Sequence, residues 1–445
     1  MSETWGQKQP SRQALQTRKG DGAARCAGSG EVPNRRALLK SVTGLGVAAG
    51  LNPLIGLAGA HGALQDAEPR NPFADGRPGS NPDGRYPDGL RAPSRKPGAG
   101  GEPIVGRWAR LADMPIPVQE IYPAPFWTET IARRQGTRAL RAQRFNIIVS
   151  AGGITGVDRG PFRASDQSFI FDPATNTWTT GPRLPGPRHH LHLVPHNGFL
   201  FALGGFSTLE RRRQRRGVPS AQTGWTMRNE VWRLDDINDR WRPMAPMPIP
   251  QAEAACVSLG GFIHIAGGRS PTGSLNGAWS DHIDTDKHYV YDARGDRWFE
   301  AAPMPTPRNS MAAVGLRGAI YTFGGRTVNG GNLAVTQAYD PLADRWQTMR
   351  PMPKPQGGTA AAAIGNTIFV FGGEYFSGRT GNGGVYREIW AFDTSEDRWR
   401  SAGLMPRPRH GHGAVSIGDT IYTLGGASQP GGYGTSAVTD VFSVY

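Results

Sequence analysis

Cysteine is almost absent from this sequence, whose 445 residues include only Cys26 and Cys256. Two cysteines are too few for a disulfide framework and cannot supply a zinc site built from cysteine ligands. Long hydrophobic runs are also missing, because no apolar stretch reaches the ~18–20 residues that a membrane-spanning helix needs. The formal net charge of +14 favours anionic partners, bound with an affinity that falls as the salt concentration rises.

Residues 1–60 have the features of an export signal. The pair Arg35-Arg36 precedes a mildly apolar run from Val42 to Leu57, and Ala58-Gly59-Ala60 offers a small-residue cleavage site. Basic, apolar and small-residue regions in this order are typical of a secretory signal, and the paired arginines resemble a twin-arginine signal. We therefore expect a periplasmic or secreted protein without a membrane span once mature. A disordered basic tail and an uncleaved membrane anchor remain alternatives.

Residues 61–106 are rich in proline, glycine, aspartate and arginine. Such a composition lacks the apolar residues needed to build a core, so we expect a flexible linker.

From residue 107 to residue 445 the chain repeats itself about every 50 residues. Each copy contains short apolar strands joined by Gly, Pro and Asp. Glycine pairs begin at Gly152, Gly204, Gly267, Gly324, Gly372 and Gly425, and tryptophans follow acidic turns at Trp178, Trp241, Trp298, Trp346 and Trp399. In five copies a proline lies 17 residues before the first glycine of the pair, at Pro187, Pro250, Pro307, Pro355 and Pro408. This constant spacing indicates a rigid two-strand unit within a propeller array.

The repeats resemble the kelch family, whose blades carry a double glycine after the second strand and a tryptophan in the fourth. The resemblance implies an all-β fold, a six-bladed β-propeller of four-stranded antiparallel blades. The last copy lacks its tryptophan, and Arg107-Trp108 near the start of the repeats supplies a matching strand. We therefore expect one N-terminal and three C-terminal strands to close the propeller, which removes exposed sheet edges.

The two faces of such a propeller would differ in the length of their connections. Turns between the first and second strands have two residues, as at Asn197-Gly198 and Gly365-Asn366. Loops between the second and third strands are long and varied. We expect function on this loop-rich face.

Residues that follow the blade-opening prolines are expected to surround the mouth of the central channel. Planar donors, carboxylates and aromatic rings suit a small polar or carbohydrate-like ligand, including an acidic one. The predicted ligand-binding residues are Arg188, Gln251, Glu253, Arg308, Asn309, Gln356, Arg409 and His410, with Arg269, Arg326, Glu374, Trp225 and Trp279 from the loops. The alternative is that these groups pair with one another and form a structural network instead of binding a ligand.

An enzymatic role is a second hypothesis. Glu120, Glu253 and His190 could supply an acid and a base to a periplasmic sugar epimerase or mutarotase. This activity is favoured over a copper-radical oxidase, because Cys256 lies in an apolar strand and no Tyr-His pair follows it.

The remaining features give weaker signals. The histidine-rich segments 189–192 and 410–412 do not specify a third ligand, so we predict no metal and no cofactor. The run from Arg211 to Arg216 could contact an anionic envelope polymer. Export argues against nucleic acid as a partner. A protein-interaction scaffold, with an envelope protein as the partner, is the third functional class.

Overall fold

The structure is a computed structural model that describes residues 102–131, 142–155, 163–208, 225–329, 331–376 and 383–444. The predicted export signal, most of the predicted linker and the run Arg211 to Arg216 lie outside these ranges. Regular structure in the described ranges is β-strand, apart from one 3-10 turn, η3 (Trp279–Asp281). The predicted all-β class is confirmed. Nowhere in this part of the chain is there a helix with the length and apolarity that crossing a membrane requires.

Six antiparallel four-stranded sheets contain most of the strands. We number them in chain order. Sheet 1 contains β3 (Ala124–Ile131), β4 (Ala142–Ala151), β7 (Ser168–Asp172) and β8 (Thr177–Thr180). Sheet 2 contains β9 (His192–His196), β10 (Phe199–Leu203), β13 (Val231–Leu234) and β14 (Arg242–Met244). Sheet 3 contains β15 (Ala255–Leu259), β16 (Phe262–Ala266), β19 (His288–Asp292) and β20 (Arg297–Glu300).

The other three sheets follow the same order of strands. Sheet 4 contains β21 (Ala312–Leu316), β22 (Ala319–Phe323), β23 (Thr336–Asp340) and β24 (Arg345–Met349). Sheet 5 contains β25 (Ala360–Ile364), β26 (Thr367–Phe371), β29 (Glu388–Asp393) and β30 (Arg398–Leu404). Sheet 6 contains β31 (Gly413–Ile417), β32 (Thr420–Leu424), β33 (Thr439–Val444) and β1 (Gly106–Arg110).

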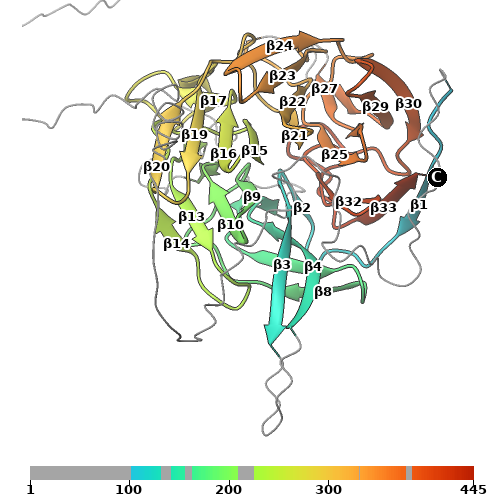
Figure 1. Cartoon of the computed structure of the whole chain (residues 1–445), viewed down its shortest axis with the longest axis horizontal. Helices are drawn as coiled ribbons and strands as arrows, with labels where there is room; N and C mark the ends of the chain where they lie inside the picture. Colours follow the sequence, from blue (N-terminus) through green and yellow to red (C-terminus); the bar gives the residue numbers. More distant parts are fainter. Residues whose placement is uncertain are drawn as a thin grey trace, which may run out of the picture. The chain divides into compact units, whose positions relative to one another are not determined.

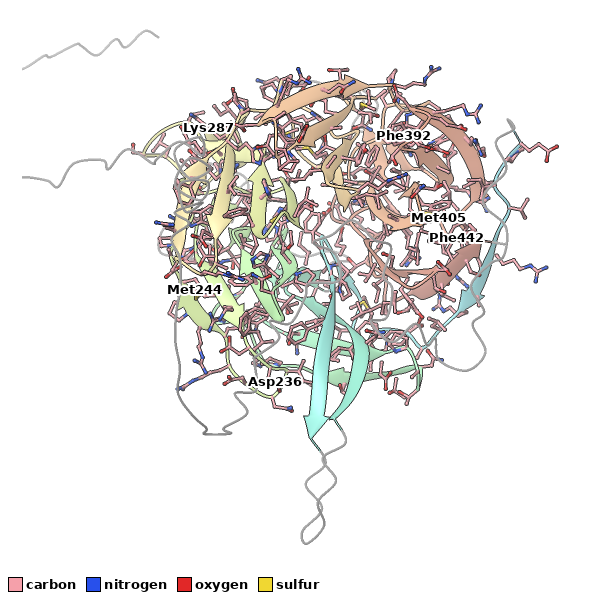
Figure 2. The ribbon with its side chains drawn as sticks, viewed as in Figure 1. Asp236, Met244, Lys287, Phe392, Met405 and Phe442 are labelled. Carbon is pink, nitrogen blue, oxygen red and sulfur yellow. The ribbon has the colours of Figure 1, made fainter. Side chains whose placement is uncertain are left out.

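Sheet 6 joins strands from near both ends of the described chain. β1 pairs antiparallel with β33, and Trp108 lies opposite Phe442. The two rings are 5.1 Å apart between centroids. Phe442 and Met405 are both buried in one apolar cluster, and Figure 2 labels the two side chains close together.

The sheets are arranged around a common centre, as Figure 1 shows. Their first strands contact one another in succession, and β3 contacts both β9 and β31. Apolar residues fill the space between neighbouring sheets. One such cluster joins Phe126 and Val149 of sheet 1 to Leu200 and Trp232 of sheet 2.

The glycine pairs join each sheet to the next, and their backbone explains why only glycine fits. Gly372 has a φ of 57°, and a Cβ atom added there would lie 2.2 Å from the carbonyl oxygen of Arg409. Side chains are disfavoured both by the left-handed backbone and by this contact. The next residue, Gly373, donates its N–H to the same carbonyl oxygen at 2.9 Å. Gly324 and Gly325 contact Gln356 in the same way.

The repeated tryptophans connect the outer strand of a sheet to the preceding repeat. Trp298 donates its indole N–H to the carbonyl oxygen of Ala245 at 3.0 Å. Asp296, two residues earlier, accepts the N–H of the same residue at 2.8 Å. Trp346 and Asp344 contact Ala302 in the same manner. The Asp-x-Trp pattern is thus a two-point hydrogen-bonded connection between neighbours.

The loop-rich face carries small additional sheets that follow the glycine pairs. Three have two strands: β11 (Phe206–Ser207) with β12 (Thr226–Met227), β17 (Arg269–Pro271) with β18 (His282–Asp284), and β27 (Glu374–Phe376) with β28 (Gly383–Val385). The fourth joins β2 (Val118–Gln119), β5 (Ile154–Thr155) and β6 (Arg163–Ala164). These pairings fix the backbone of several long loops in place.

Candidate functional site

Six residues, one from each repeat, lie at the centre of the loop-rich face. Each is the third residue of the segment that follows the repeat's proline, and each has a left-handed backbone with φ between 52° and 66°. Five backbone hydrogen bonds of 2.7–3.1 Å connect neighbouring members of the group. We call them the inner residues: Glu120, His190, Glu253, Ser310, Gly358 and Gly411.

The predicted acid–base group comes together among the inner residues. His190 Nε2 lies 2.9 Å from Glu120 Oε2 and 3.3 Å from Glu253 Oε1. All three side chains are buried or nearly so. Each comes from a different sheet's first segment, so the contacts connect neighbouring repeats.

Three loop and strand residues extend this charged network. Arg326 forms an ion pair with Glu374, and its guanidinium NH2 lies 3.8 Å from Glu253 Oε1. His410 Nδ1 lies 3.5 Å from both Glu120 and Glu374 carboxylate oxygens. Glu374 also accepts the N–H of Gly431 at 2.7 Å. Together with the three residues above, these groups form the channel-mouth network.

The protonation of the network follows from its contacts. Burial by itself would lower the pKa of His190, but the charges of Glu120 and Glu253 outweigh burial and raise it. His190 Nδ1 lies 2.7 Å from Nδ1 of His189, whose pKa burial and the His190 charge hold well below the usual value. A doubly protonated His190 therefore donates to a carboxylate on one side and to neutral His189 on the other.

Glu120 is the ionised partner of this histidine. Burial favours its protonated form, but His190, His410 and Arg326 have the larger combined effect and lower its pKa. Burial and the charge of the same carboxylate raise the pKa of the Tyr122 hydroxyl. Glu120 is therefore ionised at neutral pH, has no proton to donate and, because its pKa is lowered, is a weak proton acceptor.

Glu253 is the least satisfied member of the network. Its side chain is 1% exposed, and neither carboxylate oxygen accepts a hydrogen bond from the described residues. Arg269 Nε and Arg326 NH2 each lie 3.8 Å from this carboxylate, beyond hydrogen-bonding distance. The charges of these neighbours compensate Glu253 without direct donors.

Four predicted ligand-binding residues do not line the channel mouth. Gln251, Arg308, Gln356 and Arg409 follow their prolines directly and are fully or almost fully buried. Each donates to the carbonyl oxygen of the first glycine of its own pair, as Arg308 Nε does to Gly324 at 2.8 Å. These bonds span the first hairpin of the repeat and account for the constant spacing between proline and glycine.

The other predicted residues occupy varied positions. Arg188 contacts Glu230 at 3.3 Å and the Trp232 ring. Asn309 donates to Asp284. Trp225 packs against His189 and Phe206, and so covers one side of the network. Trp279 begins the turn η3, and its side chain lies outside the described part of the structure.

Sequence reasoning missed His189 as the partner of His190, although the two are adjacent. It also missed most of the exposed apolar side chains of the loop-rich face, although it placed Tyr375 there. Tyr375 and Phe376 in β27 are 42% and 52% exposed. Leu275, Ile283 and Tyr433 in other loops are about half exposed. Within the described ranges, no group of three or more His, Cys, Asp or Glu side chains is arranged to hold a metal ion.

Comparisons with known proteins point to one family. A family profile described as the KLHDC2/KLHL20/DRC7 Kelch-repeats domain matches residues 253–443. Kelch-like protein 35 of Mus musculus is 27% identical over 227 residues, which are 50% of this chain and 34% of that protein. Kelch-like protein terF of Aspergillus terreus is 26% identical over 331 residues, which are 74% of this chain and 66% of that protein. The matched regions thus span between about a third and two thirds of these relatives.

A solved structure shares the architecture at low sequence identity. The structure titled "Structure of YjhT" matches with a TM-score of 0.56 and 14% identity, and the match covers 75% of this chain and 98% of the other. This likeness concerns the fold alone.

Proposed function

The chain belongs to the kelch-repeat family, and from this premise we propose that it is a binding scaffold that receives a protein partner on its loop-rich face. We infer further that the six sheets are the blades of one propeller, closed by sheet 6. The succession of contacts among first strands and the pairing of β1 with β33 support this arrangement. Export to the periplasm or beyond is a further proposal, which rests on the sequence of residues 1–60.

The proposal rests on a difference in exposure between the charged and the apolar side chains of this face. The charged side chains at the channel mouth are mostly buried and contact one another, which leaves few of them for a ligand. The aromatic side chains of Tyr375, Phe376 and Tyr433 extend from the same loops and are about half exposed. Aromatic residues are enriched at protein-binding surfaces and among the residues that contribute most of the binding energy.

Affinity capture with matched variants tests this proposal. The double variant Phe376→Ser/Tyr433→Ser removes apolar surface from two loops of the loop-rich face. Leu342→Ser is the control, because Leu342 is 87% exposed in the tight turn between β23 and β24. We expect partners captured from extracts of the source cells to be retained by Leu342→Ser and lost by the double variant. Equal capture by all three proteins would contradict a loop-face scaffold.

A small polar ligand is a second candidate, favoured by Glu253. Its buried carboxylate has charged neighbours but accepts no hydrogen bond from the described residues, and a buried acceptor without a hydrogen bond costs about 1–3 kcal/mol or more. A hydroxyl group of a carbohydrate-like ligand could donate to it. Ligand binding raises the unfolding midpoint, so thermal unfolding with a panel of neutral and acidic sugars tests this candidate. A shift that disappears in Glu253→Gln would support it, whereas no shift with any sugar would exclude the panel's ligand classes.

A further inference from the structure

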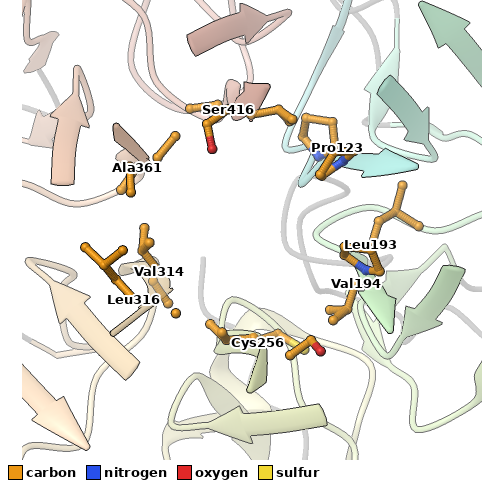
Figure 3. Close-up of a pocket in the computed structure, with 18 residues that line it drawn as sticks. Pro123, Leu193, Val194, Cys256, Val314, Leu316, Ala361 and Ser416 are labelled. Carbon is orange, nitrogen blue, oxygen red and sulfur yellow. The ribbon is translucent and has the colours of Figure 1, made fainter. Parts of the chain in front are cut away.

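Two adjacent cavities lie in the channel beneath the network, and the proposed partner surface does not use them. The larger, which we call the vestibule, has a volume of about 180 Å³ and reaches the far ends of the first strands at Leu316 and Ser416. The smaller, which we call the chamber, has about 110 Å³ and reaches Tyr122 and His412. Both are lined by Cys256 and Ala361, so they are adjacent. Figure 3 shows the lining residues of the vestibule around an open centre.

A comparison of the six repeats shows which types of residue the fold requires around the chamber. The residue after the inner residue is buried in every repeat, and four of the six are apolar: Ile121, Leu191, Ala254 and Met311. The other two are Thr359 and His412. One position further, four repeats have Ala or Gly, whereas the other two have Tyr122 and His192. Packing alone therefore does not account for polar groups at this level.

The chamber contains polar atoms that find no partner among the described residues. His412 is 3% exposed, and neither of its ring nitrogens has a hydrogen-bond partner in this part of the chain. The same holds for the hydroxyl of Thr359, which is 6% exposed. Both residues line the chamber. Because unpaired buried polar groups are destabilising, they indicate a site that a hydrogen-bonding molecule completes.

The walls of both cavities carry no charge near neutral pH. Burial and the nearby His190 lower the pKa of His192 to about 3, and burial and Arg409 lower the pKa of His412 well below its usual value. The vestibule is lined mainly by alanine, valine, leucine and proline. An engineered apolar cavity of about 150 Å³ is known to bind benzene, so the vestibule has room for one small ring.

We propose that the channel is a binding site for a small uncharged molecule that carries a hydroxyl group on an apolar ring, the chemistry of phenol. The ring would occupy the apolar vestibule. The hydroxyl would reach the chamber, where it would donate a hydrogen bond to an imidazole nitrogen of His412, and the Thr359 hydroxyl would provide a second partner. The network above closes the site towards the loop-rich face, so entry is from the face with the two-residue turns.

Titration calorimetry of the full chain with phenol tests the proposal. We expect saturable binding at one site, and binding of benzoate at least tenfold weaker because a carboxylate loses hydration in an uncharged cavity. His412→Met should weaken phenol binding about tenfold, the effect of one lost hydrogen bond. Methionine already occupies the equivalent position as Met311, so this variant should fold.

Ala361→Leu provides a second, independent variant. Ala361 lines both cavities, and Leu193 shows that the equivalent position accepts leucine. The larger side chain should fill the space and abolish phenol binding, whereas the distant Leu342→Ser should bind phenol as the unchanged protein does. Absence of phenol binding at millimolar concentration, or equal binding by Ala361→Leu, would overturn the proposal and leave a channel that holds water only.

Discussion

Because His190 is protonated in the folded protein, we predict that its contribution to stability depends on pH. Its folded-state pKa is raised above the usual value of 6.5 by Glu120 and Glu253. The stabilisation from this shift is fully present below pH 6.5 and is lost as the pH rises through the folded-state pKa. The contribution of His190 to the free energy of unfolding should therefore fall as the pH is raised above 6.5.

The size of this effect follows from proton counting. Between the unfolded and folded pKa values, the folded protein holds up to one more proton at His190 than the unfolded chain does. One proton corresponds to a change in the free energy of unfolding of about −1.4 kcal/mol per pH unit. Other buried histidines, such as His192 and His282, have lowered pKa values. These residues contribute a slope of the opposite sign, which fades as the pH rises above 6.5. The contribution of His190 is therefore isolated by the difference in slope between the original protein and a His190 variant.

Urea unfolding at pH 6.5, 7, 7.5 and 8 measures the slope. His190→Gln should make the slope more positive by up to about 1.4 kcal/mol per pH unit and should cost about 3–5 kcal/mol, because two buried carboxylates lose their partner. If that variant is too unstable to measure, Glu120→Gln/His190→Gln removes one of those charges as well. An unchanged slope in either variant would refute the assignment of the proton to His190.

Three further predictions concern the repeats and are measured by equilibrium unfolding. Gly365→Ala should cost about 1–2 kcal/mol for its left-handed backbone, since nothing lies within 4 Å of the added atom. Gly372→Ala, with a similar φ, should cost at least about 2 kcal/mol more because of the Arg409 carbonyl, and equal losses would contradict the close contact. Trp298→Phe should cost about 1 kcal/mol by removing the hydrogen bond to Ala245. Arg308→Gln should be milder than Arg308→Leu, because Gln251 and Gln356 already form the equivalent bond, and the reverse order would argue against that bond.

Much of the sheet structure could be predicted from the sequence because its signals are backbone requirements. A glycine pair is needed where a Cβ atom would meet the next repeat's carbonyl oxygen, as at Gly372. A tryptophan is needed where an indole N–H reaches a neighbouring repeat, as at Trp298. Each signal recurs in most repeats, so the pattern is visible without coordinates.

The site was harder to predict because neighbouring residues point in opposite directions. Arg308 and Ser310 are two positions apart, yet the first turns into its own sheet and the second lies among the inner residues. The left-handed backbone of the inner residues causes this change in direction. Glycines at two of these positions, Gly358 and Gly411, are consistent with a left-handed backbone. Glutamate rarely adopts this conformation, so Glu120 and Glu253 at the equivalent positions make it hard to predict from the sequence.

The inner residues link backbone strain to the proposed scaffold. Glycine would satisfy their left-handed backbone best, and each non-glycine residue there costs of order 1 kcal/mol. Sheets 1 to 3 nevertheless have Glu120, His190 and Glu253 at this position. These side chains connect through Arg326 to Glu374, the first residue of β27. Tyr375 and Phe376 follow in the same strand, and the Arg326 guanidinium lies 5.7 Å from the Phe376 ring centroid. The network thus holds in place the strand that presents two exposed aromatic residues, which lowers the entropic cost of binding a partner there.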